Sequence, residues 1–402
     1  MIVPRIRKII TTAMLFFLFF CSLAVFSGET RAQEVSIPDL NSYAAVLMEF
    51  SRGEIIFSQN GSEILHPASL TKIMTLVLAY EALQEGRVSW EDKVTISQKA
   101  WETKGSQMFL EINDQVSFGD LVTGIAVVSA NDACVAVGEY LCGSEALFVQ
   151  EMNQKATELG LTNTLFQNSS GLPDSQHYTT AEDLAVLSRY LIGNFPEYLK
   201  LHSQKEFDFN GIKQYNLNPL LRRFSGADGL KTGHTGEAGF CLVGTAVQKG
   251  LRFITVVMKA SSEAERTRDS ENMLNYAFRN YMLGEVLPAK EALSELKVTG
   301  GEKRAVSLQL DQPLETVVPF NRQEDLETHF NVPQSVAAPI AKGDPLGSVE
   351  ALLDGNVIAE APLVAAEDVD KAGFFSLLFR SVGDFLAGLW LKFVKMIGNL
   401  LS

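Results

Sequence analysis

The chain has 402 residues, 46% of them hydrophobic, and a formal net charge of −14 at pH 7. Such an acidic chain is a poor nucleic-acid binder, because phosphate backbones repel it. Its four cysteines have neither the paired spacing of a zinc site nor the density of a disulfide scaffold. The length is sufficient for one large domain and a smaller second one.

Residues 1–32 have the pattern of a secretory signal peptide. Basic residues precede an apolar run at 14–20, and a small-residue cleavage site ends at Ala32. The alternative is an uncleaved N-terminal anchor, although the apolar run is short for a membrane span. We therefore expect the mature chain to act outside the cytoplasm.

The first folded elements lead to a serine and a lysine. Apolar runs at 44–50 and 55–57 flank a glycine turn and predict a β-hairpin. A helix should begin at Pro67, and Ser69 and Lys72 then share one of its faces. Apolar residues after Lys72 favour its burial, which lowers a lysine pKa and makes a general base beside a nucleophile. Taken alone, the spacing also fits a capping serine and a solvated lysine.

A second polar group, Ser129 and Asn131, is expected on a short loop between two helices. The helix before it covers 118–126, and the helix after it opens at Asn131. We interpret Asp132 as a helix cap.

The next helices carry no predicted chemistry. Residues 145–160 have amphipathic spacing that places Met152 in the core, and Thr179 or Thr180 should cap the following helix together with Asp183. His177 could act as a general base, but Lys72 already fills that role. We therefore favour a structural role for His177.

Lys231, Thr232 and Gly233 lie in a predicted strand. Two further buried strands, at 239–246 and 251–258, should join it in one antiparallel sheet. The lysine supplies positive charge and the threonine a hydroxyl. The glycine leaves room for an extended substrate along the strand edge. A substrate with a terminal carboxylate would suit this edge.

Two cysteines, Cys134 and Cys142, lie in one predicted helix. Eight residues along a helix span about 12 Å, too far for a disulfide, so we interpret the cysteines as core thiols.

The C-terminal third changes character. Short alternating runs with Pro and Gly turns predict a small all-β domain at 284–370, either a spacer or a module that binds the wall or a protein. Residues 371–402 place aromatic and aliphatic residues at three-to-four spacing, interrupted by basic ones. This pattern predicts an amphipathic helix on a membrane surface, with a helix packed on the β domain as the alternative.

The motifs Ser69-x-x-Lys72, Ser129-x-Asn131 and Lys231-Thr232-Gly233 occur in the order typical of penicillin-binding proteins and serine β-lactamases. With their flanking residues, the chain resembles the low-molecular-weight D-alanyl-D-alanine carboxypeptidases from about residue 42 to its C-terminus. The resemblance implies an α+β architecture. A β-lactamase/transpeptidase-like catalytic domain of antiparallel sheet and helices, at 33–283, precedes the β domain and the terminal helix.

The resemblance also implies roles in catalysis. Ser69 forms the acyl-enzyme, and Ser129 relays a proton between Lys72 and the leaving amine. Asn131 hydrogen-bonds the peptide carbonyl of the substrate.

In the family that the chain resembles, the strand that contains Lys231 and one arginine bind the substrate. Lys231 and Thr232 receive the substrate carboxylate, and the backbone N–H of His234, after Gly233, completes the oxyanion hole with that of the nucleophile. Arg266 matches an arginine of the family that contacts the carboxylate, although Arg268 is close enough for the alignment to slip.

The sequence thus predicts a serine D-Ala-D-Ala carboxypeptidase that acts on peptidoglycan stem pentapeptides and is acylated by β-lactams. The resemblance implies no metal and no organic cofactor. The expected location is the outer face of the bacterial cytoplasmic membrane, with peripheral attachment through the terminal helix. A β-lactamase, which should carry an added deacylating carboxylate, and a non-catalytic wall-binding scaffold, which should have lost part of the three motifs, are the alternatives.

Overall fold

The computed structural model describes residues 39–373 and residue 390. The predicted signal peptide, and all of the predicted terminal helix beyond 373 except Trp390, lie outside the described residues. Among the residues described, no helix combines the length and the hydropathy that crossing a bilayer requires.

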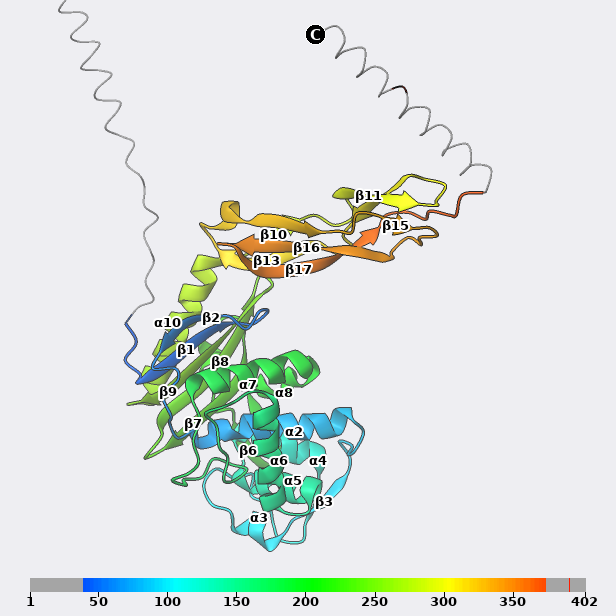
Figure 1. The fold of residues 1–402 in the computed structure, drawn as a ribbon. Coiled ribbons are helices and arrows are strands. Elements are labelled where there is room, and N and C mark those ends of the chain that lie inside the picture. The colour runs from blue at the N-terminus through cyan, green and yellow to red at the C-terminus, as the bar shows by residue number, and fades with distance from the viewer. Residues whose placement is uncertain (1–38, 374–389, 391–402) are drawn as a thin grey trace, which may run out of the picture. The chain divides into compact units, whose positions relative to one another are not determined.

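A five-stranded antiparallel sheet is the centre of the catalytic part (Figure 1). Its strand order is β2-β1-β9-β8-β7, so β7 lies at an edge. This confirms the predicted N-terminal hairpin and the predicted group of three later strands. The strands are β1 (Ala44–Glu49), β2 (Ile55–Gln59), β7 (Ala227–Thr235), β8 (Gly239–Gln248) and β9 (Leu251–Ala260).

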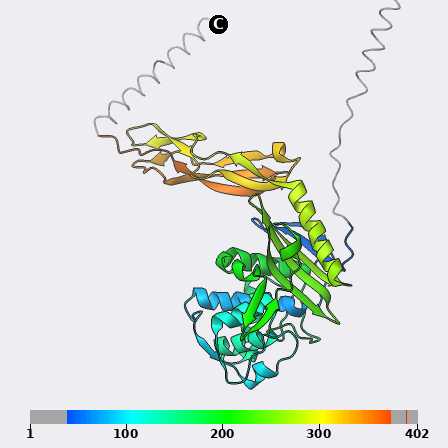
Figure 2. The same cartoon turned by 180° about the vertical axis from the view of Figure 1, so that it is seen from behind.

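Both faces of the middle of this sheet are covered, which explains why β1, β8 and β9 are mostly apolar and buried. In β1, Val46 and Met48 face one hydrophobic cluster, whereas Ala45 and Leu47 face the other. The alternation follows the two-residue period of a strand. Figures 1 and 2 show helix α10 (Glu263–Asn280) on one face and the helices of the middle of the chain on the other.

The helical layer contains the first two motifs. Several of its helices begin at a serine or threonine whose side chain accepts a backbone N–H, among them the predicted cap Thr180, which accepts from Asp183. The predicted core residue Met152 is fully buried. The elements are the 3₁₀ turn η1 (Ala68–Thr71), α2 (Lys72–Gln84), α3 (Gln98–Glu102), α4 (Phe118–Val128), α5 (Asn131–Cys142), α6 (Glu145–Glu158), α7 (Ala181–Asn194), η2 (Pro196–Tyr198), α8 (Leu199–His202) and α9 (Leu220–Arg223).

Two short antiparallel strand pairs lie among these helices, and only the second is a hairpin of consecutive elements. They are formed by β3 (Lys93–Thr95) with β4 (Gln115–Ser117), and by β5 (Glu206–Phe209) with β6 (Ile212–Tyr215). Cys134, Cys142 and Cys241 are free, as their spacing predicted.

The C-terminal part is all β among its described residues, apart from the 3₁₀ turn η3 (Gln323–Asp325), and it has its own hydrophobic cluster. One sheet pairs two strands, and the other has the order β14-β16-β17-β12-β11-β15. The pair is β10 (Tyr281–Leu287) with β13 (Leu314–Pro319). The larger sheet contains β11 (Ser294–Thr299), β12 (Ala305–Gln309), β14 (Glu327–Asn331), β15 (Val336–Ala337), β16 (Pro345–Leu353) and β17 (Asn356–Ala365).

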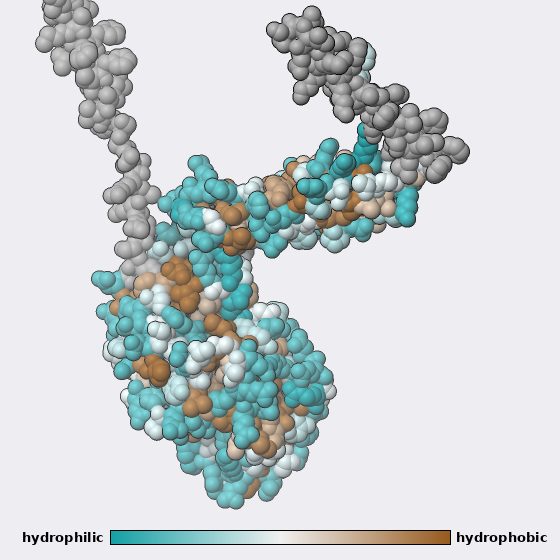
Figure 3. Space-filling model, in the orientation of Figure 1, coloured by the Kyte–Doolittle hydropathy of each residue, from teal (hydrophilic) through white to brown (hydrophobic). Residues whose placement is uncertain are grey.

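The described surface is mainly hydrophilic on the face that Figure 3 presents, with apolar residues in small, separate patches. Among the most exposed large apolar side chains are Phe320 (69%) and Tyr215 (57%), which belong to different parts of the chain. Tyr215 lines the cavity that contains the predicted motifs.

Candidate active site

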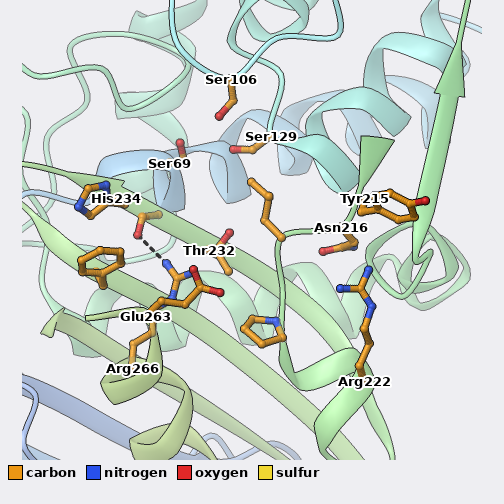
Figure 4. A pocket seen from close by; sticks show the side chains of 14 residues that line it. Ser69, Ser106, Ser129, Tyr215, Asn216, Arg222, Thr232, His234, Glu263 and Arg266 are labelled. Atoms are coloured by element: carbon orange, nitrogen blue, oxygen red, sulfur yellow. Dashed lines mark hydrogen bonds and ion pairs between the residues drawn. The ribbon is translucent and has the colours of Figure 1, made fainter. Parts of the chain in front are cut away.

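A cavity of about 510 Å³ lies along β7 and brings residues of all three motifs together. Figure 4 shows Ser69 and Ser129 across the cavity from Thr232, with His234 and Arg266 toward one end and Tyr215 and Arg222 toward the other. The remaining lining residues are Ser106, Asn216, Leu217, Pro219, Gly233, Phe240 and Glu263.

Ser69, the predicted nucleophile, lies in a tight turn rather than in a regular α-helix. Ala68 has a φ of 48°, which an α-helix does not accommodate, so η1 precedes α2 and the α-helix starts at Lys72. The Thr71 hydroxyl donates to the Ala68 carbonyl at 2.9 Å and closes this turn. Gly171 packs so closely against the same carbonyl that a Cβ atom there would lie 1.8 Å from the oxygen. Surrounding structure therefore fixes the unusual backbone that presents Ser69.

Lys72 is the general-base candidate. Its Nζ lies 2.8 Å from the Ser69 hydroxyl oxygen and 2.6 Å from the Ser170 carbonyl oxygen. The side chain is fully buried, and this burial lowers the pKa of Lys72 to about 8. Part of the population is therefore neutral near pH 7, as a base requires.

Ser129 and Asn131 each present an unpartnered oxygen. Ser129 has a φ of 63° at the end of α4, and neither its Oγ nor Asn131 Oδ1 has a hydrogen-bond partner among the described residues. Asn131 Nδ2 donates to the Lys104 carbonyl at 2.7 Å. The free atom of the amide, as oriented, is therefore an acceptor that suits a substrate N–H. The contact of Asn131 with the peptide carbonyl of the substrate, which the resemblance implies, stays a prediction.

The interpretation of Asp132 as a helix cap is wrong. Asp132 is fully buried in the first turn of α5, whereas the residue at the N-cap position is Ala130. The carboxylate accepts the backbone N–H groups of Met108 and Leu110, each at 3.2 Å. Asp132 thus attaches a loop beside the cavity to the helix that carries Asn131.

The predicted residues of β7 lie against the nucleophile. A Cβ atom on Gly233 would lie 3.1 Å from the Ser69 backbone nitrogen, so glycine permits this close approach. Lys231 is 3% exposed, and burial, followed by the charge of Lys72, lowers its pKa well below the usual value. A substrate carboxylate would offset both effects, because it favours the charged ammonium.

Arg266, rather than Arg268, reaches the cavity. Arg266 is 5% exposed, and its Nη1 donates to the carbonyls of Gly233 and Cys241 at 3.1 and 3.2 Å. Its Nε has no acceptor among the described residues. Arg268 is exposed on the same helix and does not line the cavity. Of the two arginines that the sequence left open, Arg266 is the one that lines the cavity, and its contact with a carboxylate stays a prediction.

His177 lies beneath the nucleophile turn and contacts neither Ser69 nor Lys72 through a hydrogen bond. Its Nε2 lies 2.9 Å from the Thr71 hydroxyl, and its Nδ1 accepts the Gln167 N–H at 3.5 Å. Burial lowers the pKa of His177 to about 4, so the ring is neutral. These contacts agree with the structural role that we favoured.

Sequence reasoning missed two contributors. The Ser170 carbonyl contacts Lys72, and the Ser106 carbonyl accepts the Asn131 N–H at 2.7 Å. Backbone acceptors leave no trace in residue identity, although each lies beside a glycine in a loop that the sequence marks as a turn. In residues 39–373 and 390, no three His, Cys, Asp or Glu side chains group as metal ligands.

The family model described as D-alanyl-D-alanine carboxypeptidase matches residues 31–262, and the model described as penicillin-binding protein 5, C-terminal domain, matches residues 281–371. The carboxypeptidase DacF of Bacillus subtilis is 37% identical, covering 87% of this chain and 90% of its own. DacC of Escherichia coli is 36% identical, covering 96% of both chains.

Solved structures agree with these matches. Penicillin-binding protein 5 of Haemophilus influenzae has a TM-score of 0.72 and 37% identity, over 84% of this chain and all of that one. Penicillin-binding protein D2 of Listeria monocytogenes, in its ampicillin-bound form, has a TM-score of 0.55 and 34% identity, over 60% of this chain and 98% of that one. The chain therefore belongs to the D-alanyl-D-alanine carboxypeptidase family of serine hydrolases.

Proposed function

We propose that this chain removes the terminal D-alanine from peptidoglycan stem pentapeptides through an acyl-enzyme on Ser69. The observation that carries the proposal is the buried Lys72 amine, 2.8 Å from the Ser69 hydroxyl and beside the edge strand β7. Family membership supplies the reaction class, and this geometry supports the roles that we assign to the residues.

In the first step, the neutral amine of Lys72 accepts the Ser69 hydroxyl proton while Oγ attacks the penultimate D-Ala carbonyl carbon. The negative charge that develops on the carbonyl oxygen is stabilised by the backbone N–H groups of Ser69 and His234. The C–N bond then breaks, and Ser129 passes a proton from Lys72 to the departing D-alanine amine. The unpartnered Ser129 oxygen supports this role.

In the second step, water attacks the carbonyl carbon of the ester, and the bond between that carbon and Ser69 Oγ breaks. Lys72 accepts the water proton, and Ser69 recovers its own proton through Lys72. The shortened peptide leaves with a new carboxylate. Acylation and deacylation thus use one base.

Thr232, Lys231 and Arg266 recognise the terminal carboxylate of the substrate in this scheme. Thr232 faces the cavity, and Arg266 has an unused Nε donor. Charge-assisted bonds of this kind distinguish a chain end from the middle of a peptide.

The same serine would react with β-lactams, whose ring amide takes the place of the scissile peptide. The Listeria relative has been solved in ampicillin-bound and cefotaxime-bound forms. Opening of the lactam by Ser69 would give a covalent ester without an amine that diffuses away.

The proposed location is the outer face of the bacterial cytoplasmic membrane, where peptidoglycan is accessible. The support is compositional, namely the signal-peptide pattern at 1–32 and the amphipathic pattern at 371–402. Attachment through the second segment is peripheral in this proposal.

Labelling with a fluorescent penicillin, followed by assay of D-alanine release from a pentapeptide, tests the assignment. We expect Ser69→Ala to lose both activities and Ser225→Ala, at an exposed serine outside the cavity, to keep both. Covalent labelling of the Ser69→Ala protein would refute the proposed nucleophile.

A further inference from the structure

A buried glutamate outside the cavity is connected to the general base. Glu145, the first residue of α6, is 9% exposed. One of its oxygens, Oε1, accepts the Ser169 N–H at 3.0 Å and the Ser169 hydroxyl at 2.7 Å, while Oε2 lies 2.7 Å from Lys99 Nζ. Burial alone would raise the pKa of Glu145, but the bonds from Lys99 and Ser169 outweigh it and lower that pKa. The carboxylate is therefore charged and fully engaged.

Ser169 and Ser170 contact helix α2 through their backbone carbonyls. The Ser169 carbonyl accepts the Thr75 hydroxyl at 2.5 Å, and the Ser170 carbonyl accepts Lys72 Nζ at 2.6 Å. Thr75 lies three residues after Lys72 in α2, so both contacts fall on one helical face. Glu145 thus binds the segment that supplies the acceptor for the base.

One side chain, that of Asn168, also holds residues 170–172 together through hydrogen bonds. Asn168 Oδ1 accepts the N–H groups of Ser170 at 3.2 Å, Gly171 at 2.7 Å and Leu172 at 3.1 Å. Gly171 in turn packs against the Ala68 carbonyl. A shift at Ser169 would therefore be transmitted to the turn that carries Ser69.

We infer that Glu145 is a positioning residue for Lys72, an inference that rests on the proposed function. A neutral amine has two N–H bonds and one lone pair. With one N–H donated to the Ser170 carbonyl, the rotation of the amine is restricted and its lone pair can face the Ser69 hydroxyl. Glu145 fixes that carbonyl, and it also keeps the segment packed so that water does not surround the amine.

The rate constant for acylation by a fluorescent penicillin, measured against pH on the full chain, tests this inference. Glu145→Ala should lower the acylation rate near neutral pH by about tenfold to a hundredfold. It should also shift the acid limb of the profile to higher pH. Burial is the main cause of the low Lys72 pKa, and water that enters beside the amine would raise that pKa. Glu145→Gln should stay within about threefold of wild type, since its amide oxygen can accept the same two bonds from Ser169.

Two further variants guard against an uninformative loss of folding. Glu151→Ala, at an exposed residue of the same helix, should leave the profile unchanged. Ser169→Ala removes one of the two bonds and keeps the backbone N–H, so we expect a smaller fall in rate in the same direction.

Three outcomes would overturn the inference. The first is a Glu145→Ala protein with a lower Tm but a wild-type acylation profile, which would make Glu145 merely structural. The second is an equal loss in Glu145→Gln, which would show that charge rather than position matters. The third is a Ser169→Ala protein as fast as wild type. Labelling that survives Ser69→Ala would refute the proposed function instead.

Discussion

Lys72 is a fully buried lysine, and its burial has a cost that depends on pH. Its pKa is about 8 in the folded protein, against 10.5 for an ordinary lysine, so the unfolded chain binds more protons between these values. This group therefore makes stability rise with pH across that window. Below pH 8 the penalty is fully present, about 3 kcal/mol at 1.36 kcal/mol per pKa unit.

Replacing Lys72 by methionine should remove that penalty together with the base. We expect the stability of Lys72→Met relative to wild type to be greater at pH 7 than at pH 10.5 by about 3 kcal/mol. Urea denaturation at the two pH values measures this difference, and acylation by penicillin should be lost at both. A relative stability that does not change with pH would mean that Lys72 is not the buried titrating group.

Thr232 is predicted to recognise the terminal carboxylate of the substrate. Measuring two enzymes, wild type and Thr232→Val, on two substrates, with and without that carboxylate, isolates this contact. A charge-assisted contact contributes about 1.5–3 kcal/mol, so Thr232→Val should lower kcat/KM on a D-Ala-D-Ala peptide roughly tenfold to a hundredfold. The same change should matter much less for a peptide whose terminal carboxylate is amidated. The wild type should also disfavour the amide. Additive losses in the four measurements would remove Thr232 from carboxylate recognition.

The site residues that could be predicted from the sequence are those that belong to short local motifs. Ser69 and Lys72 are one helical turn apart, so their proximity needs no knowledge of the fold. Asp132 was misread because the backbone N–H donors of its carboxylate, in Met108 and Leu110, lie more than twenty residues earlier, and only the fold brings them close. The Ser170 carbonyl was missed because every residue has one.

At the scale of elements, Asp132 connects α5 to the loop before α4. Asp132→Ala would leave the buried N–H groups of Met108 and Leu110 without an acceptor. We expect a loss of about 2–4 kcal/mol in the free energy of unfolding and slower acylation, since the loop also contacts Asn131. Urea denaturation and penicillin labelling measure these effects. The control Glu111→Ala, at an exposed residue of the same loop, should change stability by less than about 0.5 kcal/mol.

Strands β1, β8 and β9 of the central sheet were predictable because burial on both faces gives long apolar runs. The helices from 118 and 145 were predictable from their apolar periodicity and caps. The short elements were not. The strands of the β3–β4 and β5–β6 pairs, and α9, have three or four residues each, too few to show a period. The turn at η1 depends on packing by Gly171, which is a hundred residues away in the chain.

At the scale of the molecule, we expect the catalytic chemistry and the membrane contact to be separable. Truncation after Asp370 should release the mature protein from membranes while activity on a soluble peptide stays within about twofold, because the three motifs all lie before residue 262. Co-sedimentation with anionic vesicles and D-alanine release measure the two properties. A truncated protein that still sediments with the vesicles would refute attachment through 371–402.

The position of β1 inside the sheet determines when the sheet can form during synthesis of the chain. β1 pairs along its whole length with residues 253–258 of β9, so a strand made early waits for a partner made more than two hundred residues later. Contacts so distant in sequence are formed slowly, because a long loop must close before they contribute. The edge strand β7 is joined to β1 only through β8 and β9. A growing chain therefore contains Ser69 long before β9 completes the sheet, and we expect reactivity toward penicillin to appear only after the catalytic sheet is complete.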